Sequence, residues 1–310
     1  NATLDADELE RERAVILQEI HQSRDTPDDV IFDKFQETAF PDQPLGRPVL
    51  GTAERIETVA RDNVADYLQS QYYAPRMVVS AAGNLAHAPL VELAEAAFAT
   101  VIPQGDDGAQ PAAYQGGDFR EARDLEQVQL ILGFEGIAFD DADYYPLAVL
   151  STLLGGGMSS RLFQEVREKR GLAYSIYSFV ANYADGGLFG IHAGTGEAEV
   201  EELVPVVCEE LARAREPASE QELARARTQL KSGTLMGRES TGSRTEQAAR
   251  QLQIYGRTVP VAEVVAKIDA VEAADVTRIA KRLFESPLTA AALGPVGRLE
   301  EYDRIAGRLR

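Results

Sequence analysis

Two glutamates near the start of the sequence, Glu12 and Glu19, have the residue type and spacing to take part in metal-dependent chemistry. They lie in the run Glu8–His21, which has no glycine or proline and is rich in good helix formers, so we expect a helix there. Two helical turns bring both carboxylates onto one face, with Val15 and Ile16 between them. Apolar neighbours favour partial burial of a carboxylate, which then requires a partner such as a metal ion. The alternative is a solvated helix with Glu–Arg pairs.

These carboxylates must be positioned by a succession of helices and short strands. After the turn Asp25-Thr-Pro27, a second helix extends to about Phe40 and places Asp29 and Asp33 on one face. We expect further helices over 61–72, 89–100, 142–154, 159–170, 197–215, 220–236, 244–255, 274–284 and 299–309. We expect strands over 77–82, 127–134, 175–183, 187–193 and 289–293.

A change in composition divides the predicted α+β chain. Residues 106–120 are rich in glycine, glutamine and aspartate, and we interpret them as a linker between domains. The first domain then covers residues 1–105 and the second covers residues 121–310.

The composition argues against several classes of function. The net charge is −19 and no run of Lys or Arg stands out, which argues against nucleic-acid binding. The single cysteine, Cys208, permits no disulfide within the chain, and no apolar run is long enough to span a membrane. Because residue 1 is Asn rather than Met, we expect the natural chain to start upstream. The acidic, Ala- and Arg-rich composition favours the bacterial cytoplasm, with the periplasm and the mitochondrial matrix as alternatives.

One sequence pattern occurs twice. Leu45–Val49 (Leu-Gly-Arg-Pro-Val) recurs as Tyr255–Val259 (Tyr-Gly-Arg-Thr-Val), an offset of 210 residues. Val64, near the start of the following predicted helix, recurs as Val276 at an offset of 212. A proline and then a short apolar run that ends at glycine follow in both copies. The ordered set indicates two copies of one structural unit.

The repeat includes the opening helix. Glu8–Glu19 resembles Glu222–Gly233, in which Ala226 takes the place of Glu12 and Gly233 the place of Glu19. A solvated stripe gives no reason for this difference, so the repeat favours a site in the first copy. In the second copy 95 residues separate Gln127 from Glu222, whereas only seven precede Glu8. If the copies are equal in size, about a hundred residues of the first domain are absent.

Three segments carry a resemblance to a known family: Glu10–Glu19, Pro44–Thr52 and Leu154–Tyr174. Together they resemble the pitrilysin/insulinase superfamily of zinc metallopeptidases, in its mitochondrial-processing-peptidase branch, and the resemblance covers essentially the whole chain. It implies two similar α+β domains, each a mainly antiparallel sheet packed with helices, with the first domain incomplete here.

The resemblance implies a zinc site. In the family a His-Xaa-Xaa-Glu-His motif and a distal glutamate bind zinc. Glu19 matches the distal ligand, and Glu12 matches the glutamate that orients the site. His21, His87 and His192 are the three histidines of the sequence, and none lies in such a motif. We therefore expect this chain alone to be inactive, with zinc bound in the full-length protein.

The second domain supplies the other implied residues. Arg167 and Tyr174 match an arginine–tyrosine pair that faces the zinc and polarises the scissile carbonyl. Without the resemblance, Tyr174 would be interpreted as a core aromatic of a strand. Asp29 and Asp33 match acidic positions that contact a basic substrate residue, with the solvated start of a helix as the alternative.

These matches indicate a zinc-dependent endopeptidase of the processing-peptidase type that hydrolyses peptides, and the acidic pair favours cleavage near basic residues. Family members of this size act as homodimers or as heterodimers with a related subunit. The alternative is a non-catalytic subunit that supplies the Arg/Tyr pair or binds peptide for a catalytic partner. A third hypothesis is a peptide-binding module without a metal ion.

Overall fold

The computed structural model describes residues 2–101 and 110–310. The chain forms two compact units, each built from three segments. Unit 1 comprises Asn1–Gln22, Val49–Gln110 and Gly233–Val261, and unit 2 comprises Ser23–Pro48, Pro111–Ser232 and Ala262–Arg310. The predicted domain boundaries at 105 and 121 stay a prediction, and residues 106–109 of the predicted linker lie outside the described residues.

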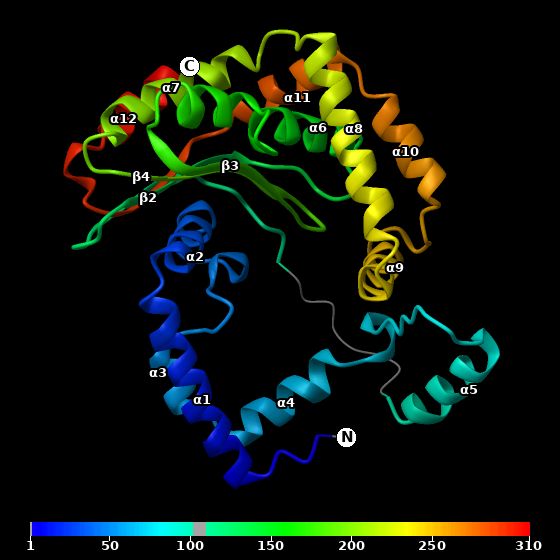
Figure 1. The fold of residues 1–310 in the computed structure, drawn as a ribbon. Helices are drawn as coiled ribbons and strands as arrows, with labels where there is room; N and C mark the ends of the chain where they lie inside the picture. The colour runs from blue at the N-terminus through cyan, green and yellow to red at the C-terminus, as the bar shows by residue number, and fades with distance from the viewer. Residues whose placement is uncertain (1, 102–109) are drawn as a thin grey trace. The chain divides into compact units, whose positions relative to one another are not determined.

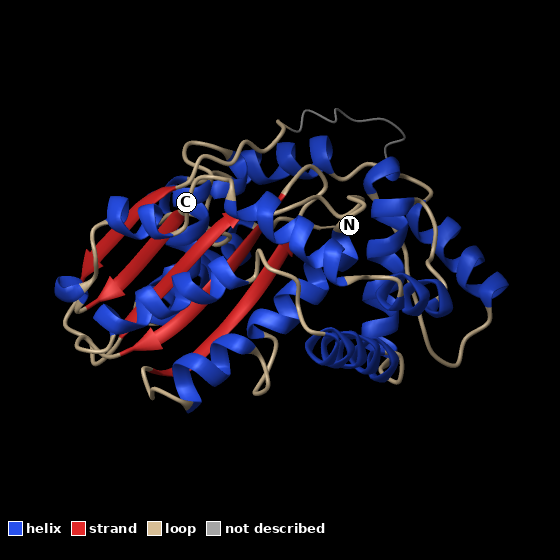
Figure 2. Ribbon diagram, turned by 90° about the horizontal axis from the view of Figure 1, so that it is seen from above, coloured by secondary structure: helices blue, strands red, loops and turns tan. Residues whose placement is uncertain are grey.

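Unit 2 is organised around a five-stranded sheet with the order β1-β5-β2-β4-β3 (Figure 2). The strands are β1 (Gly117–Ala122), β2 (Val128–Glu135), β3 (Ala173–Asn182), β4 (Gly187–Thr195) and β5 (Thr289–Gly294). β1 and β5 are parallel, and the other neighbouring pairs are antiparallel. The α+β prediction is therefore confirmed. The sequence patterns predicted β2 to β5 and missed β1, a charged strand at the edge of the sheet.

Helices cover both faces of this sheet (Figure 1). On one face lie α6 (Tyr144–Gly155), α7 (Val200–Arg213), α11 (Ala273–Phe284) and α12 (Tyr302–Arg308). On the other face lies α2 (Pro27–Ala39). The other regular elements that lie wholly or partly in unit 2 are α8 (Glu220–Gly237), α10 (Val261–Asp269) and the short turns η1 (Pro44–Gly46) and η4 (Val296–Arg298). Ser23 and Arg24, at the end of the first helix, and the segment after α6 also belong to it and are described below.

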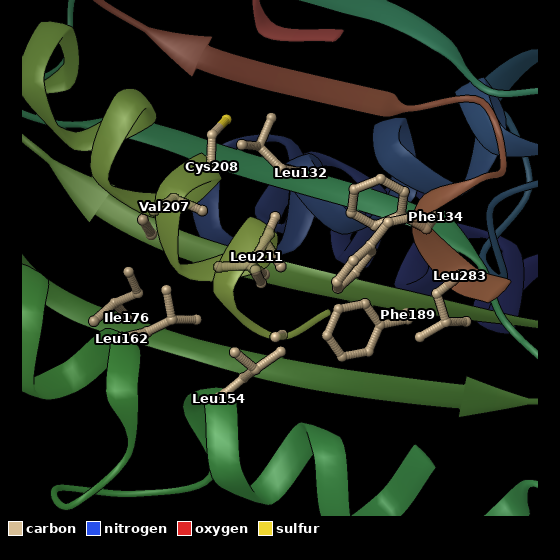
Figure 3. Packing of buried hydrophobic residues seen from close by; sticks show 14 of the residues in the cluster. Leu132, Phe134, Leu154, Leu162, Ile176, Phe189, Val207, Cys208, Leu211 and Leu283 are labelled. Atoms are coloured by element: carbon tan, nitrogen blue, oxygen red, sulfur yellow. The ribbon is translucent and has the colours of Figure 1, made fainter. Parts of the chain in front are cut away.

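The larger hydrophobic core lies between the sheet and its four-helix layer. Figure 3 shows Phe134 and Phe189 from the sheet close to Leu283 of α11, with Leu211 of α7 beside them. These side chains are at most 1 % exposed. Cys208 belongs to the same core, and burial raises the pKa of its thiol to about 12. A smaller core joins α2 to the opposite face of the sheet through Ile31 and Phe35. The sheet is thus fixed on both faces, which makes it a rigid support for residues at its edge.

Unit 1 is helical in its described part. It contains α3 (Ala53–Thr58), α4 (Arg61–Gln71), η2 (Ala74–Arg76), α5 (His87–Phe98) and α9 (Thr241–Tyr255), with α1 (Ala6–Arg24) as far as Gln22. Arg13 of α1 donates hydrogen bonds to the backbone oxygens of Ile56 and Val59, the latter at 2.8 Å. The Ser80 hydroxyl donates to Thr245 O (2.9 Å). No helix of at least 18 described residues in either unit is apolar enough to span a bilayer.

The prediction of a strand over residues 77–82 is wrong, because this segment has no regular secondary structure. A strand requires a neighbour for its backbone hydrogen bonds, and none of the described residues of unit 1 forms one. In the second copy of the repeat, β5 pairs with both β1 and β2. The corresponding helices of the two copies also differ in burial. α11 has five buried residues, whereas α4 has none.

One ion pair joins the segment after α6 to the start of α8. Arg161 Nε donates to Glu222 Oε1 (2.7 Å), and Arg161 Nη2 donates to Glu222 Oε2 (3.1 Å). Glu222 also accepts hydrogen bonds from the backbone N–H (3.0 Å) and hydroxyl (2.7 Å) of Ser219. The Arg161 hydrogen bond, followed by those from Ser219, lowers the pKa of Glu222 to about 2 against the opposing effect of burial. Both partners of the pair are mostly buried, so it is more than a solvated surface contact.

We predict that Glu222→Gln lowers the free energy of unfolding by about 1.5–3 kcal/mol at pH 7, because it breaks hydrogen bonds to a charged group. Since the folded-state pKa is depressed, the stabilisation is present above the pKa of the unfolded state and is lost as the pH falls toward 2. Urea unfolding of both proteins between pH 7 and pH 3 measures this. The control is Glu220→Gln on the same helix, because the Glu220 side chain, which pairs with Arg227, is 80 % exposed. An equal effect of both substitutions, or a Glu222→Gln effect independent of pH, would contradict the prediction.

Candidate active site

The segment that carries Arg167 departs from α-helical geometry. The sequence predicts a helix over 159–170, and the chain does become helical at Arg161. Phe163–Glu168, however, form a six-residue π-helix (η3), in which Lys169 N donates to Gln164 O (3.0 Å), five residues back. π-helical turns are rare and are found often at functional sites. The irregularity places Arg167 at a position that a regular helix would not give it.

Tyr174 lies at a second irregularity, in β3. Ala173 is opposite Thr195 of β4 and Ser175 is opposite Gly194, so Tyr174 is an extra residue without a cross-strand partner. Such a β-bulge redirects a side chain and is frequent beside active sites. Ala173 belongs to the core, but Tyr174 is 76 % exposed. The interpretation of Tyr174 as a core aromatic is therefore excluded.

The two irregular segments bring Arg167 and Tyr174 together. The guanidinium carbon of Arg167 lies 4.8 Å from the centroid of the Tyr174 ring, a cation–π distance. The same carbon lies 4.9 Å from the centroid of the Phe163 ring. Across the described parts of the chain, the Arg167 side chain has neither a hydrogen-bond acceptor nor an ion-pair partner.

The neighbouring cations are paired, in contrast to Arg167. Glu165 accepts hydrogen bonds from Lys169 Nζ (2.5 Å) and from Arg170 Nη1 (2.8 Å). These bonds, with that of Lys169 the larger, lower the pKa of the Glu165 carboxyl. Arg161 is bound to Glu222. The guanidinium N–H groups of Arg167 therefore remain available to an acceptor on another molecule, such as a peptide carbonyl or a carboxylate.

Asp29 and Asp33 lie on α2, in the same unit as Arg167 and Tyr174. Both residues are exposed, and neither has an ion pair with another described residue. Burial and then the charge of Asp29 raise the pKa of Asp33, although Lys34 acts in the opposite direction. The two carboxylates thus repel each other, and a bound cation would relieve that repulsion. Their role in substrate binding stays a prediction.

His192 has a structural environment. It is 4 % exposed, its Nε2 is 3.0 Å from Gln129 Oε1, and its ring packs between those of Phe32 and Tyr177. Burial lowers its pKa, against the opposing charge of Asp28. The imidazole is therefore a buried, hydrogen-bonded part of the sheet face that α2 covers. His21 and His87 are exposed.

Glu12 and Glu19 lie on α1, within unit 1. The expected helix is confirmed, but both glutamates are exposed rather than partly buried. The arginines beside them pair elsewhere, Arg11 with Glu8 and Arg13 with Glu10. The described residues contain no group of three His, Cys, Asp or Glu side chains that could hold a metal ion. They therefore do not make up the ligand set of a zinc site by themselves.

Phe163 is the residue of this region that sequence reasoning missed. An aromatic residue four positions before an arginine in a predicted helix is a recognisable signal, because side chains at that spacing meet on one helical face. The π-helix had no such signal, since Leu162 and Val166 have ordinary α-helical spacing and are both buried.

The chain is similar to known peptidases over most of its length. Residues 58–230 match the family described as the peptidase M16 inactive domain. A protein named as a zinc protease in Rickettsia bellii is 38% identical over 296 residues, which are 95% of this chain and 72% of that protein. A zinc protease of Streptomyces coelicolor is 37% identical, with coverage of 98% and 67%. A probable mitochondrial-processing peptidase subunit beta of Arabidopsis thaliana is 34% identical, with coverage of 99% and 61%.

A solved structure shares the fold. A chain of complex III2 from Candida albicans, determined with Inz-5 bound, superposes with a TM-score of 0.87 at 20% sequence identity. The match covers 96% of this chain and 74% of that chain. The agreement of the family match, the sequence relatives and the two-sided α+β architecture leads to one conclusion: the chain belongs to the peptidase M16 family of zinc proteases and processing peptidases.

Proposed function

We propose that this protein is a zinc-dependent endopeptidase of the processing-peptidase type, in which Arg167 and Tyr174 bind the substrate at the peptide bond to be cleaved. The observation that carries the proposal is the Arg167 guanidinium, whose carbon lies 4.8 Å from the centroid of the exposed Tyr174 ring and which has no acceptor among the described residues. The family relationship supports a peptide as the ligand.

The chemistry of the pair suits peptide hydrolysis. When a nucleophile attacks a peptide carbonyl, negative charge develops on the carbonyl oxygen. The Tyr174 hydroxyl and the Arg167 N–H groups are hydrogen-bond donors, and the guanidinium also carries a full positive charge. Because both side chains come from structured segments of unit 2, little reorganisation is needed when the charge develops.

The zinc-binding part of the proposal rests on Glu19 as a ligand and Glu12 as the residue that orients the site. Two features support it: the family relationship and the absence of both carboxylates from the second copy of the repeat. Glu19 is exposed and has no ion-pair partner among the described residues, so its carboxylate is available. The remaining ligands would come from outside the described residues.

The acidic pair on α2 suggests a substrate preference. Asp29 and Asp33 are unpaired among the described residues and repel each other, so they are suited to a basic side chain of the peptide. We therefore propose that the peptide carries Arg or Lys near the cleaved bond.

A second candidate is a non-catalytic member of the family. Such a subunit would supply Arg167 and Tyr174, or bind peptide, for a catalytic partner in a heterodimer. If the protein is itself the enzyme, we propose that it forms a homodimer. The family description of residues 58–230 as an inactive domain favours this candidate. The bacterial relatives named as zinc proteases favour a bacterial enzyme. We propose the cytoplasm as its compartment on the composition alone, with the periplasm and the mitochondrial matrix as the alternatives.

We predict that Tyr174→Phe and Arg167→Ala each lower kcat/KM for an Arg-containing peptide by about 100-fold, as expected for loss of one oxyanion donor. The assay measures hydrolysis of a fluorogenic peptide by the zinc-loaded full-length protein. The control is Tyr177→Phe, a partly exposed tyrosine on the same strand whose hydroxyl has no hydrogen bond to a described residue. Wild-type activity in the Tyr174→Phe and Arg167→Ala variants would contradict the proposal.

A metal titration separates the two candidates. For the enzyme we predict zinc uptake in the purified full-length protein and about 10- to 100-fold weaker zinc affinity in Glu12→Gln, because residues that orient a metal ligand contribute this much to metal affinity. Glu19→Gln should weaken zinc binding further. Glu10→Gln, an exposed glutamate on the same helix, serves as the control. Peptide binding that depends on Tyr174 in a protein without zinc uptake would favour the non-catalytic subunit.

A further inference from the structure

The Arg167 guanidinium lies close to two aromatic rings from different elements. Phe163, in the π-helix, is 4.9 Å from the guanidinium carbon, and Tyr174, in β3, is 4.8 Å from it. Each distance is within the range of a favourable cation–π interaction. Two rings acting on one cation restrict a side chain that otherwise has many rotamers.

Phe163 is not explained by the hydrophobic cores. Its neighbours Leu162 and Val166 are fully buried members of the larger core, whereas Phe163 is only partly buried and belongs to neither core. Among the described residues, the aromatic contact of Phe163 is with Arg167. The packing of unit 2 thus gives no separate reason for an aromatic side chain at this position.

The backbone around Arg167 is held on both sides. Before it, Arg161 is tied to Glu222 of α8. After it, Gly171 N donates to Arg167 O (3.1 Å), and Leu172 N donates to Val166 O (3.0 Å). With the backbone fixed, the remaining freedom is in the side chain of Arg167, and the two rings act on that side chain.

We propose that Phe163 is a positioning residue, which together with Tyr174 holds the Arg167 guanidinium in an orientation suited to binding the substrate. This inference rests on the proposed role of Arg167 and deepens it. An aromatic ring attracts the cation without supplying an oxygen or nitrogen acceptor, and the guanidinium has five N–H donors. Donors therefore stay open to an acceptor, which is a peptide carbonyl or carboxylate oxygen.

A double-mutant cycle tests the proposal on the intact, zinc-loaded protein, with peptide hydrolysis and peptide affinity as separate readouts. Phe163→Leu removes the ring and keeps an apolar side chain, Phe163→Tyr restores a ring, and Glu168→Gln changes an exposed residue of the same π-helix. We expect Phe163→Leu to lower kcat/KM or peptide affinity by about fivefold, in line with the strength of an exposed cation–π contact. Phe163→Tyr and Glu168→Gln should stay within about twofold of wild type.

The cycle is decisive in the Arg167→Ala background. If Phe163 acts through Arg167, Phe163→Leu changes nothing further there, because coupled residues are not additive. An undiminished effect of Phe163→Leu in that background, or no effect in the wild-type background, would overturn the proposal and leave the role of Arg167 standing.

A second measurement tests the positioning role of Phe163 separately from the proposed function of Arg167 and Tyr174. If Arg167→Ala itself has no effect, the proposed function of the pair is wrong, and NMR of the Arg167 Nε–H group then decides the positioning role alone. The two rings should shift this resonance from its position in an unstructured peptide. Phe163→Leu should move the resonance toward that position and Phe163→Tyr should not. No change in Phe163→Leu would overturn the proposal.

Discussion

Arg167 carries a positive charge that no carboxylate among the described residues neutralises, although the chain has 50 acidic residues and 31 basic ones. Its neighbours Lys169 and Arg170 both pair with Glu165, so a carboxylate lies nearby in the sequence that Arg167 does not use. The side chain is supported by aromatic faces instead, which stabilise the cation without using its N–H donors. The guanidinium N–H groups therefore remain available to an acceptor on another molecule, which we propose is the substrate.

The architecture of unit 2 accounts for how this arrangement is maintained. Helices pack on both faces of the sheet, so the edge strand β3 has a fixed position from which the bulge at Tyr174 projects. The π-helix lies between two fixed points. Arg161 before it pairs with Glu222 of α8, and Gly171 after it has a φ of 66°, in the left-handed region that glycine adopts readily. The π-helix and the β-bulge each depart from regular geometry within rigid surroundings, and together they bring Arg167 and Tyr174 into contact. The acidic pair on α2 belongs to the same unit, and its preference for a basic substrate residue stays a proposal.

Sequence patterns predicted the parts of the fold in which local preference and burial agree. The apolar runs of β2 and β5 and the amphipathic pattern of α11 are examples. β1 was missed because an edge strand with the sequence Gly-Asp-Phe-Arg-Glu-Ala has little apolar content. The strand predicted over 77–82 is wrong for the reverse reason: its residues suit a strand, but among the described residues no partner pairs with them. Pairing depends on distant parts of the chain, which a local pattern does not contain.

The candidate site was predictable to a similar extent. The resemblance identified Arg167 and Tyr174, and the structure places them in contact. Their contact depends on a π-turn and a bulge, which arise from tertiary packing rather than from local preference. For Glu12 and Glu19, apolar neighbours suggested partial burial, but both are exposed on α1, so their proposed roles rest on the family relationship and the repeat. The central claim concerns the donors of Arg167 and Tyr174, which have no acceptor among the described residues. A crystal structure of the protein with a non-cleavable Arg-containing peptide tests it most directly. The account predicts a peptide oxygen about 2.7–3.2 Å from the Arg167 guanidinium nitrogens or the Tyr174 hydroxyl. A bound peptide that contacts neither side chain would contradict it.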